Sequence, residues 1–143
     1  MHLDRDETPT ERADRNLAEL LQEVRVALPG VQVLFAFLLA VPFQPRFADT
    51  TQLQIDVYFG TLLCSAAASA LLIFPSAYHR LNFRRGDKEH IVLVAQRATV
   101  AGLAALALAM TGAVVLVTDW LFGPAVVAVA AGAVTVMFAG LWF

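Results

Sequence analysis

Four long segments without any charged residue constrain this chain more than any other feature of its sequence. They are residues 26–43, 57–77, 98–117 and 124–143. Each is about 18 to 21 residues long, and roughly 20 apolar residues are needed to cross a bilayer as a helix. The sequence therefore predicts four transmembrane helices, and it excludes an ordinary soluble domain, a DNA-binding protein and a secreted disulfide scaffold.

The composition agrees with a membrane location. Of the 143 residues, 59% are hydrophobic and 15% are charged, whereas an average soluble domain is about half apolar and a quarter charged. Cys64 is the only cysteine, so an intrachain disulfide is excluded. The first 25 residues carry many charges of both signs, which is unlike a cleavable signal peptide.

The predicted fold is an all-α, integral membrane four-helix bundle with an N-terminal amphipathic cytoplasmic helix. We expect residues 1–8 to be a disordered tail and residues 9–143 to form a single membrane domain. Thr8, Pro9 and Glu11 have the pattern of a capping box that starts a helix. The expected elements are an amphipathic helix at residues 9–25 and spans at about 26–43, 54–78, 90–117 and 124–143.

Two local features refine this picture. Pro29-Gly30 is the expected kink or hinge between the amphipathic helix and the first span. Small residues recur four apart in the later spans, where they let helix backbones approach closely. The pairs and triplets are Ser65 and Ser69, then Ala101, Ala105 and Ala109, then Ala128 and Gly132.

Positive charges are distributed unevenly among the connections. The connection at residues 79–90 has four strong ones: Arg80, Arg84, Arg85 and Lys88. The first connection has only Arg46, and the third has no positive charge. Because short loops rich in Lys and Arg stay in the cytoplasm, we expect a multi-pass protein of the plasma membrane with both termini cytoplasmic.

This basic loop is a candidate contact for anionic lipid headgroups at the inner leaflet. The alternative is that its charges only determine the topology. His79 and His90 lack further ligands at metal-binding spacing, so no metal site is expected. No nucleophile stands with a base and an orienting group, and no phosphate-binding loop is present. We therefore expect no catalytic residue, no enzyme activity, no cofactor and no nucleic acid partner.

Depth counting identifies a second candidate site. Counting about 20 residues back from Phe43, the outer end of the first span, reaches Glu23. The same count from Val117, the outer end of the third span, reaches Arg97, so both residues are expected at the inner interface. Gln32 is the only strongly polar side chain left near the middle of the membrane, and no carboxylate or histidine is expected there. A proton or sodium relay usually needs such a group, so its absence from the sequence disfavours ion-coupled transport.

The resulting interfacial cluster consists of Glu19, Glu23, Arg25, Gln32 and Arg97. One interpretation is an ion pair between Arg97 and Glu23 or Glu19 that fixes the packing of the first and third helices. On that interpretation the Arg97→Leu substitution should reduce the yield of folded protein in detergent. The other interpretation is a functional ion or ligand site, and the sequence leaves both open.

The first helix carries a specific motif. It comprises residues 19–26, residues 30–39 and Pro42-Phe43, and Tyr58, Pro75, His79-Arg80, Phe83-Arg84 and Arg97 fit the same pattern. This pattern resembles an uncharacterised family of small four-helix actinobacterial membrane proteins, a domain of unknown function that is sometimes labelled a sodium/proton antiporter. Leu28-Pro29 replaces the polar pair that family members have before the glycine. The resemblance implies the four-helix fold and a bacterial inner membrane.

Two functions follow as expectations. The first is a structural or accessory membrane protein whose cytoplasmic face contacts lipid headgroups or a partner. The second is a small ion-coupled, sodium/proton-type transporter or channel that works as an oligomer, with Gln32, Arg97 and Glu23 near its path. Besides the bilayer itself, the expected partners are anionic lipid headgroups and either a second copy of the chain or another membrane protein.

Overall fold

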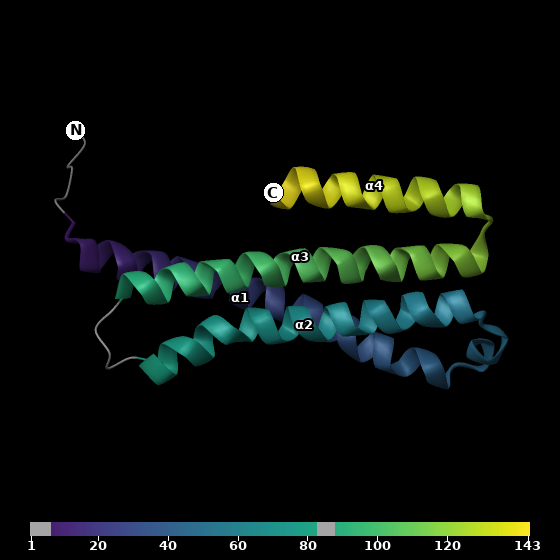
Figure 1. The fold of residues 1–143 in the computed structure, drawn as a ribbon, viewed down its shortest axis with the longest axis horizontal. Helices are drawn as coiled ribbons and strands as arrows, with labels where there is room; N and C mark the ends of the chain where they lie inside the picture. The colour runs from purple at the N-terminus through teal and green to yellow at the C-terminus, as the bar shows by residue number, and fades with distance from the viewer. Residues whose placement is uncertain (1–6, 83–87) are drawn as a thin grey trace.

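The computed structural model describes residues 7–82 and 88–143, and it contains four helices that alternate in direction (Figure 1). They are α1 (Pro9–Ala40), α2 (Gln52–Asn82), α3 (Lys88–Leu121) and α4 (Pro124–Trp142). Two short 3-10 turns, η1 (Val41–Phe43) and η2 (Pro45–Asp49), connect α1 to α2. All four helices are long and apolar enough to cross a membrane. The predicted all-α, four-helix membrane fold is confirmed.

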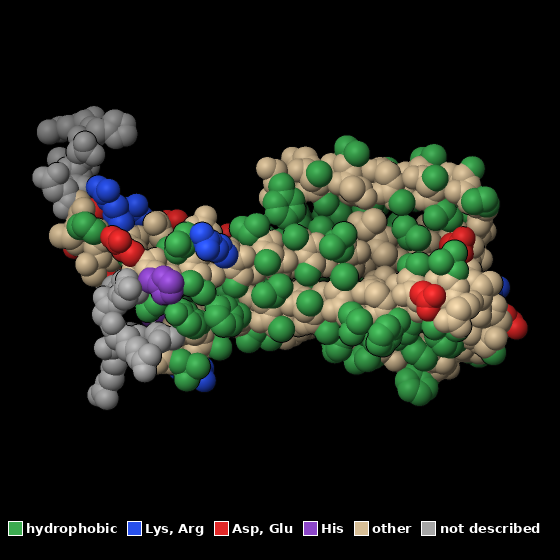
Figure 2. Space-filling view, viewed as in Figure 1, with side chains coloured by type: hydrophobic (Ala, Val, Ile, Leu, Met, Phe, Trp, Pro, Cys, Tyr) green, Lys and Arg blue, Asp and Glu red, His purple; other side chains and the backbone are tan. Residues whose placement is uncertain are grey.

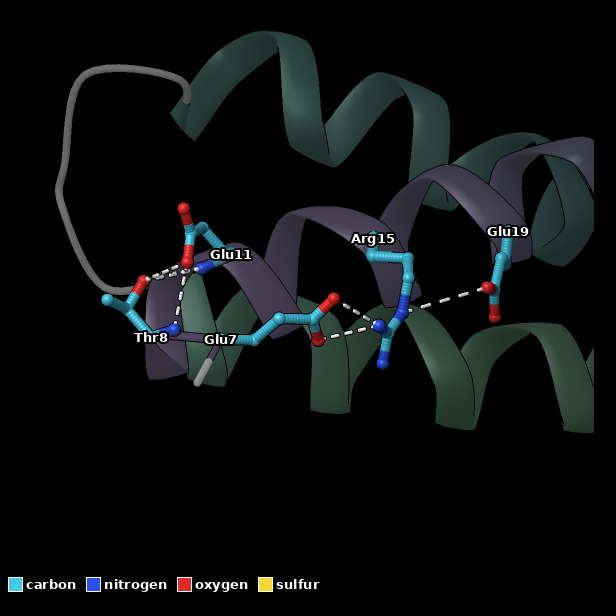
Figure 3. A network of polar contacts seen from close by, with 5 residues as sticks. All are labelled: Glu7, Thr8, Glu11, Arg15 and Glu19. Carbon is cyan, nitrogen blue, oxygen red and sulfur yellow. Dashed lines mark hydrogen bonds and ion pairs between the residues drawn. The ribbon is translucent and has the colours of Figure 1, made fainter. Parts of the chain in front are cut away.

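The start of α1 is the predicted capping box (Figure 3). The Glu11 backbone N–H donates to the Thr8 hydroxyl at 3.3 Å, and the Glu11 carboxylate accepts the Thr8 backbone N–H at 2.9 Å. Pro9 occupies the first helical position, where its missing N–H costs nothing. From there α1 continues as one helix through Pro29 to Ala40. The amphipathic segment and the first span are therefore one element.

Helices α2 and α3 form the most extensive interface of the bundle. The buried residues of α2 recur three and four positions apart, as in a left-handed helix pair: Tyr58, Thr61, Ser65, Ala68, Leu72 and Pro75. Two glycines of α3 let the backbones approach. A Cβ on Gly102 would lie 2.9 Å from Cδ2 of Leu72, and one on Gly112 would collide with the hydroxyl of Thr61.

The predicted small-residue contacts are only partly the ones used. Ser65 and Ala109 are completely buried between the helices, whereas Ala101 is exposed. The glycines at 102 and 112 lie directly against Leu72 and Thr61 of α2. Spacing identified the kind of packing, but it did not identify which of several small residues faces the neighbouring helix.

Helix α1 packs against both α2 and α3 along one narrow line. The buried residues that form this line lie seven positions apart: Leu17, Val24, Val31 and Leu38. Val24 and Val31 belong to a core cluster with Ala68 and Leu72 of α2 and Leu106 of α3. The centre of the bundle is therefore built by three helices.

Helix α4 is different, because among the described residues it packs against α3 alone. Its 19 residues span about 28 Å, which matches the roughly 30 Å of hydrocarbon in a bilayer. Phe138, Ala139 and Phe143 lie beside Ala104 and Leu108 of α3. The first 16 residues of α3, about 24 Å of helix, therefore extend past the end of α4 (Figure 1).

We call this projecting region the three-helix end; it comprises residues 9–23 of α1, 73–82 of α2 and 88–103 of α3. Most of the Lys, Arg and His side chains visible in Figure 2 gather there. Hydrophobic side chains cover much of the surface between this region and the opposite end of the bundle. The three-helix end therefore differs in charge from the largely apolar surface of the rest of the bundle.

Candidate functional site

A polar groove runs between α1 and α3 on the three-helix end. It has a volume of about 340 Å³. Its polar lining residues are Asn16, Glu19 and Glu23 of α1 and Gln96 and Thr99 of α3, and apolar side chains complete the lining: Leu20, Val92, Val100 and Leu103. Residues three and four apart on a helix share one face, which is why these side chains meet in a single groove.

A second, apolar groove continues the first toward the centre of the membrane. It has a volume of about 540 Å³ and shares Glu23 and Leu103 with the polar groove. Its other lining residues are almost entirely apolar and include a side chain from α4: Val26, Ala27, Gly30, Leu34, Leu106, Met110 and Trp142. The two grooves therefore form one continuous surface whose polarity changes at Glu23 and Leu103.

The ion pair between Arg97 and Glu19 or Glu23, one of the two interpretations of the cluster, does not form among the residues that the structure describes. Arg97 is exposed, and no ion pair joins it to either glutamate within the part of the chain that the structure describes. The cause is its position on α3. Arg97 lies seven residues before Ala104, which faces α4, and residues seven apart share one side of a helix. Arg97 is therefore on the α4 side of α3, past the end of α4.

The other cluster residues are also divided between surfaces. Gln32 and Arg25 are exposed, and because they are seven residues apart they lie on the same flank of α1. Nine residues separate Gln32 from Glu23, which at about 100° per residue places them on opposite flanks of α1. Of the predicted cluster, only Glu19 and Glu23 share a site.

The ion pairs that do form at this end are on the surface. The Arg15 guanidinium donates to both carboxylate oxygens of Glu7 at 2.6 Å, and its Nε lies 3.9 Å from Glu19 (Figure 3). Exposed pairs of this kind contribute about 1 kcal/mol or less. They orient the first turns of α1 and leave the second oxygen of Glu19, and all of Glu23, available to the groove.

Sequence reasoning missed Asn16, Gln96 and Thr99. A usable signal was present, because residues 92, 96, 99 and 103 follow helical spacing on α3 and include two polar side chains. Arg97 is adjacent to Gln96 in the sequence but lies on a different side of α3, so its charge does not mark the side that lines the groove.

The candidate lipid-contacting residues are only partly described. Arg80 is exposed in the last turn of α2, where a positive charge interacts favourably with the helix dipole. Arg84 and Arg85 lie outside the described residues, and so does the side chain of Lys88.

Several hydroxyl groups inside the spans donate to carbonyls of their own helices. The Thr61 hydroxyl donates to the carbonyl of Val57 at 2.7 Å, and the Thr111 hydroxyl donates to that of Ala107 at 2.8 Å. Ser65, Ser69 and Thr99 bond in the same way. Within the described residues no group of three His, Cys, Asp or Glu side chains could hold a metal ion. In the polar groove, by contrast, the side chains of Asn16, Glu23 and Gln96 form no hydrogen bond or ion pair in the part of the chain that the structure describes.

The fold and the placement of the charges define a multi-pass α-helical membrane protein. The chain belongs to a family of unknown function, DUF6328, whose family model matches residues 6–143. This match confirms the resemblance of the first-helix motif to an uncharacterised family. No curated protein and no solved structure is significantly similar to the chain.

Proposed function

We propose that this protein is a structural or accessory component of the plasma membrane that acts through its three-helix end on the cytoplasmic side. The observation that carries the proposal is the projection of α1, α2 and α3 past the end of α4. A charged surface of three packed helices beside the headgroups can bind a membrane-protein partner, a second copy of the chain or anionic lipids. No catalytic role is part of this proposal.

The uneven distribution of positive charge supports the cytoplasmic orientation. Arg80 is on this end, and the basic residues that follow it in the sequence belong to the same connection. Each basic residue near an anionic leaflet contributes about 1 kcal/mol of attraction. The basic loop is therefore suited to hold the three-helix end against the inner leaflet.

Transport by an oligomer, as in a sodium/proton-type transporter or channel, has less support. Gln32 and Glu23 are on opposite flanks of α1, and Arg97 faces the α4 side of α3, so these residues do not line one path. The hydroxyls of Thr61, Ser69 and Thr111, which lie within the spans, already donate to carbonyls of their own helices. A path between subunits would have to be built from surfaces that are largely apolar.

Purification from native membranes under mild detergent tests the proposal. A partner in fixed stoichiometry with the full chain is expected, and the double variant Arg80→Glu with Arg97→Glu should lose it. Asp119→Asn, which changes a charge at the opposite end of the bundle, is the matched control and should retain the partner.

A second measurement addresses transport directly. The purified protein is placed in liposomes that contain a pH-sensitive dye, under sodium or potassium gradients. Proton flux that depends on the cation and disappears in Glu23→Gln would overturn the accessory function.

A further inference from the structure

We propose that the continuous groove between α1 and α3 binds a phospholipid with a primary-amine headgroup, a phosphatidylethanolamine, from the leaflet next to the three-helix end. This lipid site is separate from the basic loop and does not depend on the accessory function proposed above. The inference rests on the polarity, the depth and the charge of the groove.

The polarity of the groove changes once along its length, as the polarity of a lipid does. The section at the three-helix end contains the carboxylates of Glu19 and Glu23 and the amides of Asn16 and Gln96. The section beyond Glu23 is apolar and extends along α3 as far as Met110, with Trp142 lining it where α4 ends. A headgroup fits the first section and an acyl chain fits the second.

The depth and length of the groove also match a lipid of one leaflet. The polarity changes at Glu23 and Leu103, next to the level at which α4 ends, and hence at the edge of the hydrocarbon. From Glu23 to Leu34 the apolar section follows 11 residues of α1, about 16 Å. One leaflet contributes about half of the roughly 30 Å of hydrocarbon, so the apolar section is as long as one leaflet is thick.

The charge of the polar section favours an ammonium group. Glu19 and Glu23 are its charged lining residues, and no basic residue lines it. Glu23 makes no ion pair within the described part of the chain, and the ion pair of Glu19 with Arg15 is long, at 3.9 Å. An anionic headgroup would be repelled, whereas an ammonium is attracted to the two carboxylates. The amides of Asn16 and Gln96 supply N–H donors for the lipid phosphate.

The same groups distinguish a primary amine from a choline. A primary ammonium donates three hydrogen bonds, which carboxylates accept. A quaternary ammonium donates none and is typically recognised by a cage of aromatic rings. No aromatic residue lines the polar section, so ethanolamine suits it better than choline.

Trp142 provides a direct reporter for the acyl chain, because it lines the apolar section and its ring packs 4.7 Å from the ring of Phe138. The background Trp120→Phe leaves Trp142 as the only tryptophan. The full-length variant is placed in bilayers that contain brominated phosphatidylethanolamine, phosphatidylcholine or phosphatidylglycerol at equal mole fractions. We expect the relative association constant obtained from Trp142 quenching to be roughly threefold higher for phosphatidylethanolamine than for the other two lipids. A factor of this size corresponds to the free energy of one exposed charge contact.

Two pairs of variants test the two sections separately. Glu19→Gln with Glu23→Gln should abolish the preference for ethanolamine, while Glu89→Gln, an exposed carboxylate outside the groove, should preserve it. Gly30→Leu should fill the apolar section and reduce quenching by every brominated lipid. Gly60→Leu is its matched control, because a Cβ on either glycine meets no atom within 4 Å.

Four outcomes would overturn the proposal. Two concern the lipids: equal quenching of Trp142 by all three, or stronger quenching by phosphatidylglycerol than by phosphatidylethanolamine. The third is a preference for phosphatidylethanolamine that persists in Glu19→Gln with Glu23→Gln. The fourth is the absence of quenching by any lipid because a second copy of the chain covers Trp142. Circular dichroism of each variant confirms that the helices are intact, so that a lost preference is not a lost fold.

Discussion

The hydroxyl of Tyr58 on α2 donates a hydrogen bond of 2.7 Å to the backbone carbonyl of Leu38 on α1, inside the bundle. In a regular helix this carbonyl would accept the N–H of residue 42, but residue 42 is proline and has none. The N–H of Val41 also points to the same oxygen as α1 tightens into a 3-10 turn. The Tyr58 hydroxyl thus donates to the Leu38 carbonyl in place of the N–H that Pro42 lacks. The same hydrogen bond links α2 to α1 at this point.

Tyr58→Phe should lower the free energy of unfolding by about 1 kcal/mol, because the hydroxyl is lost and the Leu38 carbonyl stays buried with a weaker donor set. Unfolding by SDS in mixed micelles measures the loss. In a Pro42→Ala background the N–H of residue 42 is restored, so the same Tyr58→Phe change should cost much less. An equal cost in both backgrounds would show that Tyr58 does not compensate for the proline.

Gly102→Ala should destabilise the bundle by about 1 to 3 kcal/mol, the usual cost of overpacking a tight interface. The new methyl group would lie 2.9 Å from Cδ2 of Leu72, and Leu72 is completely buried. Gly132→Ala on α4, where a Cβ meets no atom within 4 Å, is the control and should be neutral. The same SDS titration measures both variants.

Gly112→Ala should be destabilising for a different reason, because its methyl group would collide with the hydroxyl of Thr61. Thr61→Ala removes that hydroxyl and should recover most of the loss when it is combined with Gly112→Ala. If the double variant is no more stable than the sum of the single changes predicts, the close approach of α2 and α3 at this point is not set by Thr61.

How far the sequence determines this structure depends on the kind of feature. The four uncharged segments predict the spans, because the cost of burying charge in lipid leaves no other arrangement. The capping box is predictable because Thr8, Pro9 and Glu11 interact with their own helix. These features need only local chemistry or one strong physical rule.

Features that depend on the rotation of one helix against another could not be predicted. Gln96 and Arg97 are adjacent in the sequence, yet Gln96 lines the polar groove and Arg97 faces the side of α4. Successive residues of a helix are about 100° apart. A rotation of α3 about its axis by this angle would therefore bring Arg97 to the polar groove in place of Gln96. That rotation is fixed by contacts such as Gly102 against Leu72, which are visible only once the helices are packed.

Arg97→Leu should change the free energy of unfolding by no more than about 0.5 kcal/mol, as is usual for an exposed position. This expectation replaces the loss of folded protein that an ion pair with Glu23 would have implied. Leu72→Ala, at a completely buried position, should cost about 2 to 5 kcal/mol in the same assay. Loss of folded protein in Arg97→Leu would show that the arginine has a structural partner after all.

Thr8→Ala should destabilise the first turn of α1 by about 1 kcal/mol, because its hydroxyl no longer accepts the Glu11 N–H. Amide hydrogen exchange should become faster at residues 10–12 and remain unchanged at the centre of α1. Thr10→Ala, an exposed position in the same turn, should leave the exchange rates nearly unchanged. Uniform acceleration along α1 would show that the cap supports the whole helix rather than its first turn.

Helix α3 packs against all three other helices, and this determines the order in which the bundle can assemble in the membrane. Ribosomes deliver α1 and α2 first, but the core around Val24 and Leu72 is incomplete until Leu106 of α3 has arrived. Assembly in the membrane therefore has to wait for the third insertion, and α4, which contacts α3 alone in the described structure, joins a core that is already closed.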